Sequence, residues 1–99
     1  MNLQSMMAQA QRMQKDITKK KEAIDNTEFE GKSEWVEVVV MGDKKLKSLK
    51  IVKEGTIDED DKEVLEDMIS IALNDAFTKI DKELDKQLGS YGQGLSGLF

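Results

Sequence analysis

The sequence predicts an α+β fold: a helix, a two- or three-stranded antiparallel sheet, and a second helix. Apolar residues recur at three- and four-residue steps over residues 3–25 and again over residues 58–88, which is the period of an amphipathic helix. Between them, residues 29–53 change to the alternating, β-branched pattern of strands. With 99 residues and no internal repeat, the chain is expected to form one domain over residues 1–88, followed by a flexible Gly-rich tail over 89–99.

The first predicted helix, residues 3–25, has the spacing of a seam against another helix. Its apolar stripe consists of Leu3, Met6, Met7, Ala10, Met13, Ile17 and Ile24. Four members of this stripe, beginning with Leu3, lie seven positions apart. Because Lys20 interrupts the accompanying seam, we do not expect a long regular coiled coil. The helical pattern ends at Asp25-Asn26-Thr27.

The middle of the chain predicts a hairpin, with a short first strand before it at residues 29–31. Its arms are WVEVVVMG at 35–42 and LKSLKIV at 46–52, joined by a turn at residues 42–45. In the first arm, Val36, Val38 and Val40 share one face, and Val39 and Met41 share the other. A hairpin covered by a single helix layer should be apolar on one face only. We therefore expect a second layer or a partner subunit to cover the far side.

The second predicted helix, residues 58–88, has the strongest helical pattern in the chain. Asp58-Glu59-Asp60-Asp61 supplies an N-cap and places negative charge where the helix dipole favours it. The same acidic run has a second interpretation as a divalent-metal site, but no EF-hand spacing follows it and capping explains it better. Gly89 ends the helix.

The composition argues against several classes of function. The chain has neither Cys nor His, so a zinc or iron site would have to be built from carboxylates alone. It also has no Gly-rich phosphate loop and no nucleophile beside a base, so we expect no enzyme activity, no cofactor and no small-molecule substrate. No segment approaches the roughly 18–20 apolar residues of a membrane span, and the N-terminus lacks a signal-peptide pattern. A cytoplasmic protein without a membrane partner is expected, and oligomerisation is the support left to so small a domain.

Charge is unevenly distributed along this acidic chain, whose net charge is −5. Residues 1–25 hold five basic and three acidic side chains, whereas residues 58–88 hold four basic and eleven acidic ones. At about 100° per residue, Arg12, Lys15 and Lys19 fall within roughly 60° of one another, opposite the apolar stripe. Such a ridge suits phosphate contacts that position DNA without reading its sequence. The alternative is an ordinary solvated helix face, with Asp16 and Glu22 balancing the lysines.

Three stretches resemble the YbaB/EbfC family of bacterial nucleoid-associated proteins, and together they span nearly the whole chain. They are MMAQAQRMQKDI at 6–17, VEVVVMGDKKLKSLKI at 36–51 and DKEVLEDMISIALNDAFTKIDKE at 61–83. The third is the most specific, and the Gly-rich end finishing in Gly97-Leu98-Phe99 is also similar. The chain departs from the family at Ala8, where relatives often have a lysine.

The resemblance implies an αβ(β)βα subunit that dimerises through its sheet region and projects its helices as paired arms. It also implies that the arms bind double-stranded DNA with limited sequence preference, in nucleoid organisation or gene regulation. We expect phosphate contacts from the basic residues of the first helix, which are Arg12, Lys15, Lys19, Lys20 and Lys21. Lys44, Lys45 and Lys47 are weaker candidates.

For the dimer interface, we expect the middle strand to contribute Val36, Val38, Val39, Val40 and Met41. The resulting hypothesis is a homodimeric, nucleoid-associated DNA-binding protein without catalytic or metal-binding residues. The alternative is an acidic dimeric protein-interaction module, or a chaperone-like scaffold, that does not bind DNA.

Overall fold

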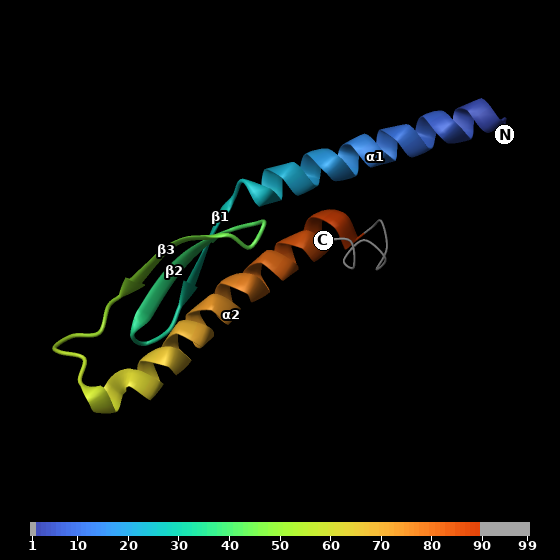
Figure 1. Ribbon diagram of the computed structural model, residues 1–99. Helices are drawn as coiled ribbons and strands as arrows, with labels where there is room; N and C mark the ends of the chain where they lie inside the picture. The colour runs from blue at the N-terminus through green and yellow to red at the C-terminus, as the bar shows by residue number, and fades with distance from the viewer. Residues whose placement is uncertain (1, 90–99) are drawn as a thin grey trace.

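The computed structural model describes residues 2–89 and confirms the predicted order of helix, antiparallel sheet and helix (Figure 1). The sheet has three strands, which resolves the choice between two and three. The elements are α1 (Leu3–Asp25), β1 (Glu28–Lys32), β2 (Val36–Met41), β3 (Leu46–Ile51), the 3-10 helix η1 (Glu59–Asp61) and α2 (Lys62–Leu88). The predicted tail, apart from Gly89, lies outside the described residues. The molecule measures 69 × 20 × 15 Å because α1 extends far beyond the sheet.

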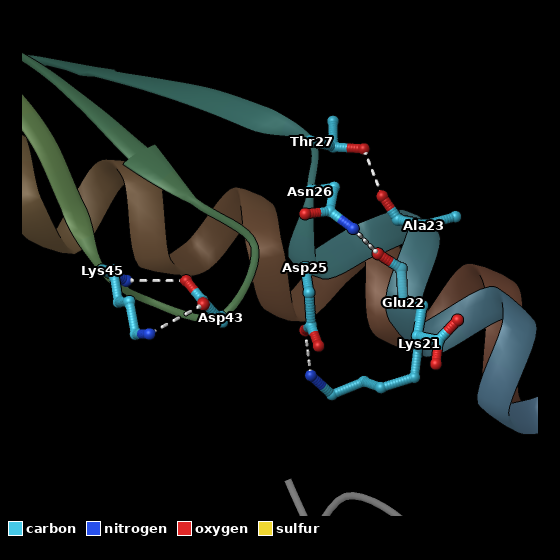
Figure 2. Close-up of polar contacts among 8 residues, drawn as sticks. All are labelled: Lys21, Glu22, Ala23, Asp25, Asn26, Thr27, Asp43 and Lys45. Carbon is cyan, nitrogen blue, oxygen red and sulfur yellow. Dashed lines mark hydrogen bonds and ion pairs between the residues drawn. The ribbon is translucent and has the colours of Figure 1, made fainter.

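Side chains cap both ends of α1. The Asn2 side-chain oxygen accepts a hydrogen bond from the backbone N–H of Ser5 at 2.7 Å. At the other end, the Asn26 amide donates to the carbonyl of Glu22 at 2.9 Å, and the Thr27 hydroxyl donates to the carbonyl of Ala23 at 2.7 Å (Figure 2). The Asn2 bond satisfies an N–H of the first turn, and the Thr27 bond satisfies a carbonyl of the last turn. The chain therefore leaves α1 in a defined direction, and two residues separate α1 from β1.

The core is a single contact layer between the sheet and α2. In the sheet order β1-β2-β3, the central strand presents Val36, Val38 and Val40 to α2, and each is at most 1% exposed. From the helix, Ala72, Ala76 and Ile80 meet them, all fully buried and spaced four residues apart. Small side chains at two of these three positions allow α2 to lie close against β1 and β2.

Two glycines mark the closest backbone approaches. A Cβ on Gly31 of β1 would lie 2.0 Å from the carbonyl oxygen of Ala72 in α2. A Cβ on Gly42, at the end of β2, would lie 1.8 Å from the carbonyl oxygen of Ile24 in α1. Only glycine fits at either point, since the atoms in the way belong to backbone. These contacts fix α2 and the base of α1 against the sheet.

A bulge in β3 sets which side chains share a face. Val38 pairs with Leu49 and Val36 with Ile51, but the register shifts between Val39 and Val40, so that Val40 pairs with Leu46. Regular alternation would place Leu46 on the opposite face from Leu49. The extra residue of the bulge instead brings Leu46, Leu49 and Ile51 onto the face that α2 packs against.

The far face of the sheet carries Val39 and Met41 from β2, both half-buried, among charged neighbours on β1 and β3. We expected a second layer or a partner subunit there. Within residues 2–89, α2 is the one helix packed across the sheet, and it packs on the other face.

Asp75 attaches the edge strand β1 to α2. Its carboxylate accepts the backbone N–H of Lys32 at 3.0 Å, and it pairs with the Lys79 ammonium at 3.4 Å. Lys79 also donates to the carbonyl of Glu30 at 2.7 Å. The Lys32 N–H, more than the charge of Lys79, holds the pKa of the Asp75 carboxyl below its ordinary value, against an opposing effect of desolvation.

We predict that Gly31→Ala destabilises the fold by about 3 kcal/mol, because the new methyl group meets backbone that cannot turn aside. Urea denaturation at one fixed protein concentration measures the loss. Gly89→Ala is the matched control, since a Cβ there has no neighbour within 4 Å. Equal stability of the two variants would contradict the close approach of β1 to α2.

We predict that Asp75→Asn makes the fold less sensitive to acid. A carboxyl whose pKa is lowered by folding adds stability above its unfolded pKa of about 3.9, and this stability is lost as the pH falls through the folded pKa. The variant should therefore be less stable than the native protein at pH 7 and lose less stability between about pH 5 and pH 2. Thermal unfolding at pH values from about 7 to about 2 measures both effects. Asp67→Asn, an exposed change on the same helix, should retain the native slope, and an equal slope in Asp75→Asn would contradict the role of this carboxylate.

Candidate nucleic-acid interface

α1 forms an arm that is held to the body only at its C-terminal end. Ile24 is the one buried residue of this helix, and Ile17 is half-buried. Gly42 holds the base by donating its backbone N–H to the carbonyl of Thr27 at 3.0 Å. Toward its N-terminus, the helix continues clear of both the sheet and α2 (Figure 1).

The five predicted DNA-binding residues of α1 separate into two groups. Lys20 pairs with Asp16 at 3.3 Å, and Lys21 pairs with Asp25 one turn further on (Figure 2). Arg12, Lys15 and Lys19 are exposed and form no ion pair with any residue from 2 to 89. We call these three residues the basic ridge. Because Asp16 faces Lys20, it does not neutralise the ridge through an ion pair.

The hairpin lysines are engaged within the protein. Lys44 pairs with Asp81 of α2 at 3.2 Å and lies 5.9 Å from the centre of the Phe77 ring. Lys45 pairs with Asp43 at 3.8 Å, and Lys47 pairs with Glu28. A phosphate would have to compete with a carboxylate at each of these positions, which makes the hairpin a weaker candidate than the ridge.

The predicted interface residues of β2 lie on both sides of the sheet. Val36, Val38 and Val40 are enclosed in the core of the same subunit and have almost no surface to offer a partner. Val39 and Met41 keep partial exposure on the far face. An interface along β2 therefore stays a prediction, restricted by burial to these two residues.

An apolar surface that sequence reasoning missed lies along β3. Leu46, Leu49 and Ile51 are 51%, 38% and 45% exposed although they face the side of the sheet that α2 occupies. α2 packs on β1 and β2 and leaves β3 largely uncovered. The neighbouring flank of α2 adds half-buried Leu73 and Phe77. We call these β3 and α2 residues the β3 surface; the bulge concealed it, because strict alternation divides the three β3 residues between two faces.

The acidic run at residues 58–61 lies away from the arm. The N-terminal end of α2, which follows the acidic run at residues 58–61, is at the opposite end of the molecule from the N-terminus of α1 (Figure 1). Among residues 2–89, no three acidic side chains are grouped so that they would hold a metal ion. Over the same range, neither helix has the combination of length and apolarity that a membrane span needs.

Comparison with known proteins places this chain in a family. The model of the YbaB/EbfC DNA-binding family matches residues 1–95. A nucleoid-associated protein of Lactococcus lactis subsp. lactis is 47% identical over 97 residues, covering 96% of this chain and 97% of the relative. Nucleoid-associated proteins of Enterococcus faecalis and Ligilactobacillus salivarius are 41% and 42% identical, covering 97% and 99% of this chain and 93% and 95% of those relatives.

Proposed function

Because the chain belongs to the YbaB/EbfC DNA-binding family, we propose that it is a nucleoid-associated protein that binds double-stranded DNA through the basic ridge of α1. One observation carries this proposal. Three cations that form no ion pair with the described residues stand on one side of an arm that leaves the acidic body. In this proposal the protein is located in the cytoplasm at the nucleoid, and it binds DNA without catalysing a reaction.

The ridge suits the DNA backbone better than the base edges. Arg12 and Lys19 are seven residues apart, or about 10 Å along the helix, which is the length of about three base pairs. Flexible cations on a convex helix face contact phosphates, and phosphate contacts position a protein without specifying a sequence. Limited sequence preference follows from this chemistry.

The β3 surface supports a homodimer. Three exposed apolar side chains on one strand, continuous with half-buried neighbours on α2, are what a second copy would cover. In such a dimer the two arms have a fixed spacing. Binding of one arm then raises the effective concentration of the other at the same duplex, so two modest ridges together bind DNA far more tightly than one.

We predict that the triple variant Arg12→Ala, Lys15→Ala, Lys19→Ala loses most of its DNA affinity and much of its salt dependence. Each phosphate contact contributes about 0.9 to the slope of log K against log salt, so three lost contacts lower the slope by up to about 2.7 per arm. Fluorescence anisotropy of a labelled duplex of about 30 base pairs, at low and near-physiological salt, measures both quantities.

The control for this experiment is Lys62→Ala, Lys82→Ala, Lys86→Ala, which removes the same charge from α2. It should bind DNA nearly as the native protein does. An equal loss of DNA affinity in both triple variants would mean that net charge determines binding and the position of the ridge does not, which would contradict the proposal. If the native protein itself did not bind, the protein-interaction module would become the better explanation of the fold.

We predict that Leu49→Glu converts the dimer into a monomer, because it places a charge at the centre of the β3 surface. Sedimentation equilibrium measures the mass. Ser48→Glu makes the same change in charge on the opposite face of β3, where Ser48 pairs with Val39. Dissociation by Ser48→Glu alone would place the interface on the far face instead, with Val39 and Met41.

A further inference from the structure

The arm has an apolar side that the described structure leaves uncovered. Leu3, Met6 and Met13 are 71%, 50% and 44% exposed. Met6, Met13, Ile17 and Ile24 fall within about 40° of one another around the helix, so Met6 and Met13 continue the side by which Ile24 is buried against the body. We call the exposed residues of this side, Leu3, Met6 and Met13, the methionine stripe. The stripe is too continuous to be scattered surface hydrophobics.

α2 runs antiparallel to α1 and ends where the stripe begins. A hollow of about 410 Å³ between the two helices is lined by Lys20 and Ile24 of α1 and by Glu83 and Gln87 of α2. Residues near the C-terminal end of α2 therefore lie beside residues that precede the C-terminal end of α1. α2 ends at Leu88, itself buried, so the C-terminal end of α2 lies close to the part of α1 around Lys20.

The chain outside the structure has the length and the chemistry to cover the stripe. The ten residues SYGQGLSGLF, 90–99, reach at most about 35 Å when extended. Along α1, Met13 is about 10 Å and Leu3 about 26 Å from Lys20. The segment has no charged side chain and carries Tyr91, Leu95, Leu98 and Phe99, separated by glycines that let a backbone approach a helix closely.

We propose that the C-terminal segment, residues 90–99, packs along the methionine stripe of α1 in the same subunit. The segment covers the apolar side of the arm and replaces the contact with α2 that ends at Leu88. Methionine suits this contact because its unbranched side chain adapts to a partner of irregular shape. The basic ridge lies on the opposite side of α1 and stays open, so the proposal is independent of DNA binding.

Cysteine pairs in the full-length chain test this proposal, since the chain has no cysteine of its own. One variant carries Met13→Cys and Leu98→Cys, and the control carries Lys15→Cys and Leu98→Cys. Residues 13 and 15 differ by about 3 Å along the helix but by about 160° around it. Mild oxidation of dilute protein, followed by non-reducing electrophoresis and peptide mass mapping, measures the rate and the connectivity of each disulfide.

We expect an intramolecular disulfide in the Met13 pair that forms at least about tenfold faster than in the Lys15 pair, in keeping with a high effective concentration on one face. Equal rates in the two pairs would mean a segment that contacts no particular face, and would overturn the proposal. A product of twice the chain mass as the main species would overturn it in favour of a second copy on the stripe.

A second measurement needs no disulfide. In the single variant Met13→Cys, the rate of alkylation of the thiol reports how far the stripe is covered. Adding Leu98→Ser and Phe99→Ser should raise that rate several-fold, whereas the same pair of changes should leave the rate at Lys15→Cys unaltered. An unchanged rate at position 13 would contradict docking of the segment. Because neither assay contains DNA, failure here is distinct from failure of the proposed function.

Discussion

The close contact between α2 and the strands β1 and β2 is the constraint on which the rest of the structure depends. It requires a glycine in β1, Gly31, opposite two alanines in α2, Ala72 and Ala76, because larger side chains would hold the helix away from the sheet. In a chain of 99 residues, this single interface contains nearly the whole buried core. The Asp75 carboxylate reinforces it by accepting the Lys32 N–H, which ties the edge strand to the helix.

The placement of α2 also decides what is left exposed. A helix centred over β1 and β2 does not reach across three strands, so the apolar residues of β3 remain at the surface although they point to the covered side. The same helix meets only the C-terminal part of α1, which leaves the remainder as an arm. The β3 surface, to which we assign dimerisation, and the arm, to which we assign DNA binding, thus both result from the position of α2 over β1 and β2.

The sequence predicts the elements well because each has a strong local cause. The apolar period, the β-branched run and the cap at Asp58 act over a few residues, and α1 and Gly89 lie where these signals put them. The basic ridge was also predictable, since helix geometry alone groups Arg12, Lys15 and Lys19. The β3 surface was not, because a one-residue bulge reverses which face Leu46 occupies and has no signal in hydrophobic alternation. Nor does the sequence show that the valines of β2 are enclosed by α2 of the same subunit, which depends on how far one helix extends across the sheet.

The separation of charge explains how an acidic protein can present a site for DNA. Repulsion between a duplex and the acidic end of α2 is screened over about 8 Å at physiological ionic strength. The N-termini of α1 and α2 stand at opposite ends of a molecule 69 Å long, several screening lengths apart. A duplex that approaches the arm from its N-terminal side therefore meets the ridge before it meets the acidic end of α2. At low salt the screening length grows and the acidic body repels DNA from further away, so the body favours approach from the arm side. The length of the arm also carries the ridge itself, because a helix that began at Ile17 would lack Arg12 and Lys15.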